Sequence, residues 1–65
     1  MAKQIQTRVE LAEDAEFYLL GKTYRFPAGS QGTAVGQTDD GRLFVAFDSD
    51  PDDSYLIRAR DLIEL

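Results

Sequence analysis

The chain has 65 residues, with seven lysines and arginines, twelve aspartates and glutamates, and neither cysteine nor histidine. Its length predicts one domain, residues 1–65, because so short a chain buries only about 60% of its unfolded surface. Its composition excludes disulfides, thiolate and imidazole chemistry, and zinc sites built on those ligands. The net charge of −5 opposes approach to nucleic-acid phosphates and anionic membranes. With no apolar span or signal-peptide core, we expect a cytoplasmic protein.

The first predicted element is a strand over residues 5–11, IQTRVEL, where apolar or β-branched residues alternate with long polar ones. This period is typical of a strand with one buried face. A helix over 10–20 is the competing interpretation. Thr7 and Glu10 fit a capping box, and Gly21 could end such a helix.

The connection from Ala12 to Gly32 is too long to be structureless in a domain of this size. It is predicted to hold a hairpin with strands at 17–20 and 23–26, joined by Gly21-Lys22, since a Gly-X loop suits a type II′ turn. The predicted hairpin has one apolar face, formed by Phe17, Leu19, Tyr24 and Phe26.

A second hairpin is predicted around Asp39-Asp40-Gly41, because Asp-Gly supplies the positive φ angles of a tight turn. Its strands are residues 33–38 and 42–47. The acidic run that follows is rich in Pro and Asp, which favour a turn. After it we expect a last full strand and a closing 3₁₀ turn or strand end. These three segments are residues 48–53, 54–60 and 61–65.

Several short strands joined by tight turns predict an all-β fold, a small barrel of about five strands with a long loop after the first strand. This fold accounts for residues 27–35, PAGSQGTAV. Gly29 and Gly32 let the chain enter the central hairpin at a sharp angle, and Gly36 permits strand coiling.

The segment from Pro27 to Asp48, PAGSQGTAVGQTDDGRLFVAFD, resembles the Gly-x-x-Gly-x-Val, Asp-Gly, Val-x-Phe signature of SH3-like barrels. Over nearly its full length, from RVELAED to RARDLIEL, the chain is similar to small bacterial domains of unknown function of the DUF4926 type. More distantly, its layout is similar to the barrel of photosystem I reaction-centre subunit IV. The resemblance implies a small SH3-like barrel and does not imply an activity.

Two short motifs are interpreted as turns. Residues 29–32, GSQG, match the Gly-x-x-Gly loop of KH nucleic-acid domains but hold no basic residue. Asp48, Asp50 and Asp52 alternate like the first ligands of a calcium loop, whose sixth and twelfth positions are here Asp53 and Ala59. We therefore expect a solvated acidic tip that protects a sheet edge, and no dedicated metal site.

Enzymatic activity is not expected. A catalytic carboxyl needs a desolvated pocket, and so small a barrel fills its interior with its own side chains. Serine and threonine nucleophiles lack a histidine base, and Lys3 and Lys22 lie near the terminus and in a turn. We therefore predict no catalytic residue and no cofactor.

The pairing of the last two long strands decides which side chains lie inside. If Asp48 pairs with Ser54, then Ala46 faces Leu56 and Phe44 faces Arg58. We predict that the opposite face, the larger and uncharged set, forms the core. That set is Leu43, Val45, Phe47, Tyr55 and Ile57.

The other face then holds an apolar stripe, Phe44, Ala46 and Leu56, with Arg58 as a cation–π neighbour of Phe44. Alternatively, Leu62, Ile63 or the long loop folds over this stripe and completes the core.

Binding candidates also lie on the loop hairpin, where Tyr18 and Arg25 point outward and are of the types favoured in hot spots. By resemblance, the long loop of SH3 domains frames their peptide groove. We therefore predict a non-enzymatic interaction module that docks a protein as subunit, regulator or inhibitor, and the acidic character of the chain favours a basic partner. Its predicted partner-binding residues are Tyr18, Arg25, Phe44, Leu56 and Arg58.

Association with nucleic acid is the alternative function. It requires five cations to gather on one side, free of carboxylates. They are Lys22, Arg25, Arg42, Arg58 and Arg60.

Overall fold

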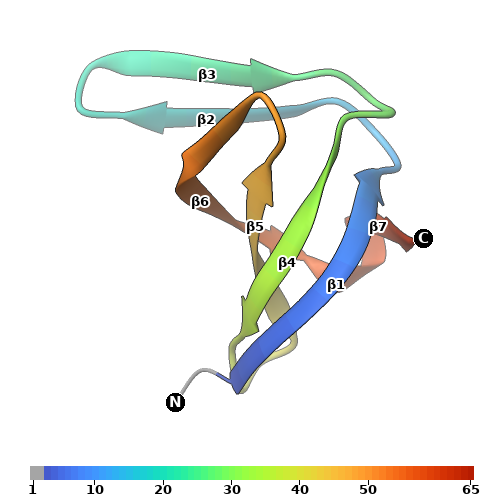
Figure 1. The fold of residues 1–65 in the computed structure, drawn as a ribbon. Coiled ribbons are helices and arrows are strands. Elements are labelled where there is room, and N and C mark those ends of the chain that lie inside the picture. The colour runs from blue at the N-terminus through green and yellow to red at the C-terminus, as the bar shows by residue number, and fades with distance from the viewer. Residues whose placement is uncertain (1–2) are drawn as a thin grey trace.

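The structure is a computed structural model that describes residues 3–65. This part of the chain forms seven strands and one short 3₁₀ turn (Figure 1). In chain order they are β1 (Lys3–Leu11), β2 (Ala15–Leu19), β3 (Lys22–Phe26), β4 (Gln31–Gln37), β5 (Arg42–Phe47), β6 (Asp50–Arg58), the 3₁₀ turn η1 (Ala59–Asp61) and β7 (Leu62–Glu64).

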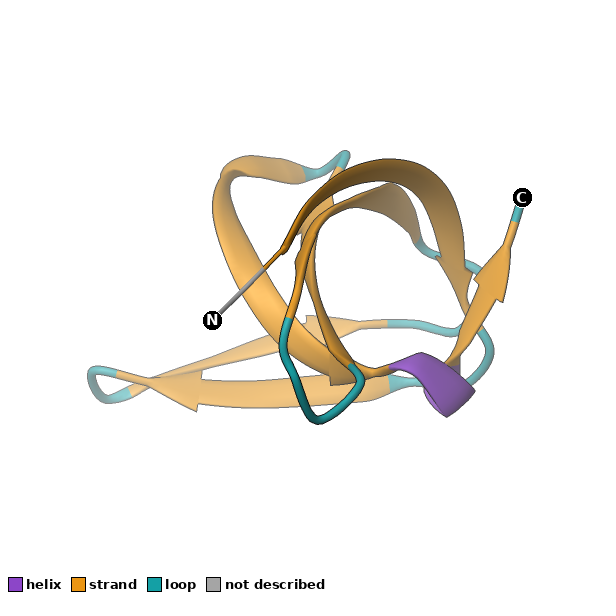
Figure 2. Cartoon of the chain, turned by 90° about the horizontal axis from the view of Figure 1, so that it is seen from below, coloured by secondary structure: helices purple, strands orange, loops and turns teal. Residues whose placement is uncertain are grey.

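The strands form two antiparallel sheets. One has five strands in the order β6-β5-β4-β1-β7, and the other is the hairpin β2-β3. The five-stranded sheet curls around on itself (Figure 2). The predicted all-β fold is confirmed. The long loop expected after the first strand contains the hairpin that forms the second sheet. The alternative helix over 10–20 is wrong, because these residues end β1 and form β2.

The hairpin after the first strand is confirmed, but its turn lies one residue earlier than predicted. Leu19 pairs with Lys22, so the two-residue loop is Leu20-Gly21 rather than Gly21-Lys22. Leu20 has a backbone φ of 50° and Gly21 of 79°. Two positive φ angles define a type I′ turn rather than the expected type II′. The cross-strand partner of Phe17 is therefore Tyr24 instead of Phe26. The two faces keep the expected composition, because this change of two residues leaves Phe17, Tyr24 and Phe26 on one face.

The core lies between the curled sheet and the hairpin. The predicted inward set of β5 and β6 is confirmed, since Val45, Phe47, Tyr55 and Ile57 are buried and Leu43 packs against them. Figure 1 shows the hairpin lying across the ends of β5 and β6. Aromatic rings join the two sheets. The ring contacts across this junction include Phe26 with Phe47, Phe26 with Tyr55, and Phe17 with Tyr55.

The predicted register between β5 and β6 is wrong by two residues. Phe44 pairs with Leu56, not with Arg58, and Arg58 lies opposite Arg42. The chain already reverses at residues 48–49, where Phe47 pairs with Asp50. The register then shifts beside Ala46 before regular pairing resumes. Residues 51–54 therefore bulge from the ladder instead of forming the turn.

The end of the chain also differs from the expectation. β6 stops at Arg58 rather than Arg60, and η1 turns the chain. β7 then pairs with the end of β1, with Leu62 opposite Leu11. Both outcomes expected for residues 61–65 occur, because Asp61 ends the 3₁₀ turn and the next three residues form a strand. Within residues 3–65, no helix has the length and apolar character needed to cross a bilayer.

Two glycines before and within β4 serve different purposes. Gly29 has a φ of 90° in a turn closed by a 3.0 Å hydrogen bond from the Ser30 N–H to the Pro27 carbonyl. Gly32 lies where β5 approaches closely, since a Cβ there would sit 2.5 Å from the Ala46 carbonyl oxygen. The first position needs a left-handed backbone, and the second needs a residue without a side chain.

Candidate docking groove

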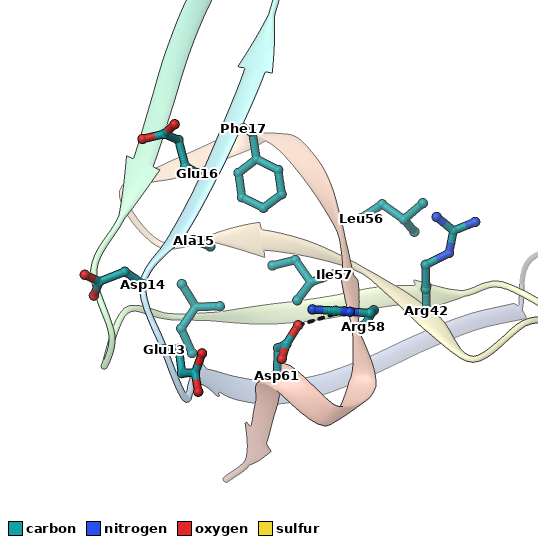
Figure 3. A pocket seen from close by; sticks show the side chains of 11 residues that line it. Glu13, Asp14, Ala15, Glu16, Phe17, Arg42, Leu56, Ile57, Arg58 and Asp61 are labelled. Atoms are coloured by element: carbon teal, nitrogen blue, oxygen red, sulfur yellow. Dashed lines mark hydrogen bonds and ion pairs between the residues drawn. The ribbon is translucent and has the colours of Figure 1, made fainter.

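A groove of about 400 Å³ lies between the start of β2 and the end of β6 with η1 (Figure 3). One wall comes from the β1–β2 connection and the other from residues 56–61, with Arg42 at one end. The groove exists because the aromatic contacts hold the β2–β3 hairpin beside β6. It therefore joins segments that are about forty residues apart in the sequence.

The first wall carries three carboxylates. Asp14 Oδ1 accepts a 2.7 Å hydrogen bond from the Ala28 backbone N–H, which ties the connection to the turn before β4. Glu16 Oε2 accepts a 2.7 Å hydrogen bond from Arg25 Nε. Glu13 is exposed, and no hydrogen bond or ion pair of its carboxylate is found within residues 3–65. As far as the described residues are concerned, Glu13 is thus open to a cation from outside.

The second wall carries charges that already compensate each other. Arg58 Nε lies 3.1 Å from Asp61 Oδ2, one turn along η1. Arg42 lies opposite Arg58 across the β5–β6 ladder and forms an ion pair of 2.9 Å with Asp40. Both arginines are thus paired with carboxylates other than Glu13.

The floor between the walls is apolar. It is formed by Ile57, which is buried, and by Phe17 and Leu56, which are half-buried. An open channel with an apolar floor and a few charged groups at its margin has the composition of a peptide-binding surface.

The structure brings some of the predicted site residues together. Leu56 and Arg58 line the groove. Arg25 lines a neighbouring hollow of about 340 Å³, which shares Asp14, Ala15 and Glu16 with the groove. Tyr18 is 73% exposed on the outer face of the hairpin. Phe44 is half-buried beside Leu56 and does not line the groove.

The predicted cation–π pair of Phe44 with Arg58 does not form in this arrangement. The ladder places Leu56 opposite Phe44, and the Arg58 guanidinium turns to Asp61. Of the residues expected to cover the stripe, Leu62 packs against the core, whereas Ile63 stays 47% exposed.

Sequence reasoning missed the acidic wall. The signal was present in the stretch AEDAE, residues 12–16, which places three carboxylates at the start of the long connection. The local pattern of those residues predicts a strand end, a loop or a helix, and does not predict a charged wall. Their meeting with Asp61 depends on the tertiary fold.

Three of the five cations of the nucleic-acid alternative are engaged by carboxylates. These ion pairs are Arg25–Glu16, Arg42–Asp40 and Arg58–Asp61, at 2.7, 2.9 and 3.1 Å. Paired cations have less charge to offer a phosphate backbone. The alternative stays a prediction without an observation in its favour.

The acidic tip after β5 is held by hydrogen bonds. Both carboxylate oxygens of Asp48 accept from Arg8, at 2.8 and 2.7 Å, and this bond lowers the pKa of Asp48. Asp50 accepts a 2.6 Å bond from the Tyr55 hydroxyl, which raises the pKa of Tyr55 to about 12. The charge of Asp50 also raises the pKa of Asp53. Within residues 3–65, no three acidic side chains are grouped so that they could hold a metal ion.

The carboxyl with the lowest pKa lies at the far end of the β4–β5 hairpin. Hydrogen bonds from Arg42 and Thr38 lower the pKa of Asp40 to about 2. Asp40 does not line the groove, and neither do Asp48, Asp53 or Tyr55. The marked pKa shifts therefore belong to groups outside the groove.

No protein-family model, curated protein or solved structure matches this chain. The resemblance to SH3-like barrels and to the DUF4926 type therefore stays a prediction. The fold defines an all-β domain with an open acidic groove, and function has to be argued from that groove.

Proposed function

We propose that this chain is a non-enzymatic interaction module of the cytoplasm that docks an extended, basic segment of a partner protein. It would serve that protein as subunit, regulator or inhibitor. The observation that carries the proposal is a single groove lined both by the exposed carboxylate of Glu13 and by the apolar side chains of Phe17 and Leu56.

The charge of the groove supports a basic occupant. A lysine or arginine beside Glu13 would gain an ion pair without displacing one, and the net charge of −5 would steer a cationic segment toward the domain. An exposed ion pair contributes only about 0 to 1 kcal/mol. Most of the affinity therefore has to come from burying apolar atoms on Phe17 and Leu56. We expect a dissociation constant in the micromolar range.

The chemistry of the groove supports binding rather than catalysis. The chain has neither histidine nor cysteine. The groups with marked pKa shifts, such as Asp40 and Tyr55, lie outside the groove. A carboxyl that acts as an acid or base near neutral pH needs desolvation or a strong neighbouring charge. The open groove provides no enclosure for a reacting group.

Selection from a random peptide library displayed on phage tests this proposal. We expect the wild-type domain to enrich peptides with lysine or arginine next to a large apolar residue. Glu13→Lys replaces attraction by repulsion and should weaken these peptides about three- to tenfold, up to about 1.4 kcal/mol. Glu64→Lys makes the same charge change at an exposed carboxylate outside the groove and serves as the matched control.

A Leu56→Ala variant, checked for folding by circular dichroism, tests the apolar floor. It should lose most of the affinity while keeping the preference for basic peptides. Enrichment of acidic peptides, or equal weakening by Glu13→Lys and Glu64→Lys, would contradict the proposal.

A further inference from the structure

The tip of the β2–β3 hairpin exposes three consecutive large side chains. Tyr18 is 73% exposed, Leu19 is 49% exposed, and Leu20 is fully exposed. Leu20 also has a positive φ of 50°, which costs a residue with a Cβ about 1 to 2 kcal/mol. An exposed leucine in a left-handed turn gains nothing from the packing of the monomer. The same turn is made more favourably by Asn-Gly.

The charge of the hairpin changes sign along its length. Glu13, Asp14 and Glu16 lie at its base, whereas residues 17–38 contain no carboxylate. Lys22 stands at the tip, opposite Leu19. The hairpin thus has an acidic base and an apolar, cationic tip. Two such hairpins laid antiparallel are complementary in charge, because each tip meets the base of the other.

The hairpin also has free edges. Within the described chain, β2 and β3 pair only with each other. Leu19 and Lys22 flank the two-residue turn, and their backbone groups hydrogen-bond to each other. The backbone N–H and C=O groups of alternate residues of β2 therefore point away from β3. On the edge of β2 these residues are Tyr18 and Glu16. Unpaired groups of this kind are a template for another strand.

We propose that this edge binds a second copy of the chain, with the two β2 strands antiparallel about a two-fold axis. Tyr18 of one copy then lies opposite Glu16 of the other. Leu20 and Lys22 reach the acidic base of the opposite hairpin. The contact is isologous and closes after two copies, so it gives a dimer rather than a filament. Joining two hairpins makes a four-stranded sheet, which is more stable than either pair alone.

Sedimentation equilibrium over a range of protein concentrations tests the dimer, with Leu20→Asn as the decisive variant. Asparagine suits the left-handed turn, so this variant should unfold at a higher temperature than wild type. It should also raise the dimer dissociation constant at least tenfold. Leu65→Asn makes the same exchange at a leucine that is 59% exposed near β7, and it should leave dimerisation unchanged.

The arrangement is tested by paramagnetic broadening between copies. The chain has no cysteine, so Ala28→Cys places one spin label at the exposed turn beside Asp14. When this labelled protein is mixed with ¹⁵N-labelled wild type, we expect broadening of amides 18–22. A label introduced by Asp39→Cys, in the β4–β5 turn at the opposite end of the molecule (Figure 1), should leave those amides sharp.

A protein that remains monomeric at all concentrations would overturn this proposal. The same holds if Leu20→Asn dimerises like wild type, or if broadening falls outside the hairpin. A monomer that sediments with phosphatidylcholine vesicles would assign the tip to a lipid surface instead. The dimer would cover part of the groove, because Glu16 lies both on the β2 edge and in the groove wall. Leu20→Asn leaves Glu13, Phe17 and Leu56 in place, so as a monomer it should bind the selected peptides at least as tightly as wild type does, and failure of the dimer and failure of the docking function give different results.

Discussion

The ring of Phe26 stacks on the ring of Phe47, with centroids 4.1 Å apart and planes at 17°. Phe26 belongs to the hairpin and Phe47 to the five-stranded sheet, and both are buried. This contact holds the two sheets together and thereby fixes one wall of the groove.

The first prediction tests that junction. Phe26→Leu keeps an apolar residue but removes the stacked ring, so we expect the free energy of unfolding to fall by about 1 to 3 kcal/mol. Urea denaturation measures the change. Tyr18→Leu removes a ring from the exposed face of the same hairpin and should change stability by less than about 0.5 kcal/mol. Equal losses in the two variants would show that the ring contact does not hold the hairpin.

The second prediction concerns alkaline pH. The hydrogen bond to Asp50 raises the pKa of Tyr55 from 10.0 to about 12 in the folded protein. The folded state therefore holds the phenol proton more tightly than the unfolded state. The bond stabilises the fold below pH 10.0 and is lost as the pH rises toward about 12.

Tyr55→Phe should lower the melting temperature at neutral pH and should lose less stability than wild type over that alkaline window. Denaturation followed at several pH values measures both effects. Tyr18→Phe, at an exposed phenol, should behave like wild type. A Tyr55→Phe variant with the wild-type alkaline profile would refute this role of the bond.

The third prediction compares two glycines. In Gly32→Ala the new Cβ would meet the backbone of Ala46 and Phe47 at 2.5 and 2.9 Å. Strands β4 and β5 would have to move apart, at a cost of at least about 2 kcal/mol. Gly29→Ala meets open space and strains only its φ of 90°, at about 1 kcal/mol. Urea denaturation should therefore rank Gly32→Ala as the more damaging change, and the reverse order would contradict this account.

The fourth prediction concerns repulsion in the acidic tip. The charges of Asp50 and Asp52 raise the pKa of Asp53, so the folded state binds the proton of Asp53 more tightly than the unfolded state does. Above that raised pKa the ionised carboxylate destabilises the fold. Asp53→Asn should therefore raise the melting temperature at pH 7.

The advantage of Asp53→Asn should shrink as the pH falls through the pKa of Asp53, because wild type then becomes neutral at this position. Calorimetric scans at neutral and acidic pH measure it. Glu64→Gln removes an exposed carboxylate outside this tip and controls for net charge. A gain that persists unchanged in acid would point to a cause other than repulsion.

Local patterns in the sequence were enough to predict most strands. Alternating residues identified β1, and the Asp40-Gly41 pair located the β4–β5 hairpin. The same alternation separated the buried face of β5 from its outer face, so that Val45 and Phe47 were correctly placed inside. These predictions were correct because a strand with one buried face carries its period within a few consecutive residues.

The predicted turn and register between β5 and β6 were wrong because the residues there carry no periodic apolar pattern. Residues 48–54 are nearly all polar, so nothing in them distinguishes a turn at 48–49 from one centred on Pro51. The β5–β6 register was therefore decided by the buried contacts of Tyr55 with the aromatic core. At the hairpin tip, moving the turn by one residue keeps Phe17 and Tyr24 on one face, so alternation could not locate it.

By itself, the sequence determined an acidic, all-β chain without histidine or cysteine, most of its strands, the turn at Asp40-Gly41, and the side chains of β5 and β6 that face the core. Only the tertiary structure decided that Glu13, Leu56 and Asp61 line the same groove. The reason is that strand patterns depend on adjacent residues, whereas the groove depends on where aromatic packing holds the hairpin against β6. That packing depends on how the aromatic rings of the hairpin fit against those of the five-stranded sheet.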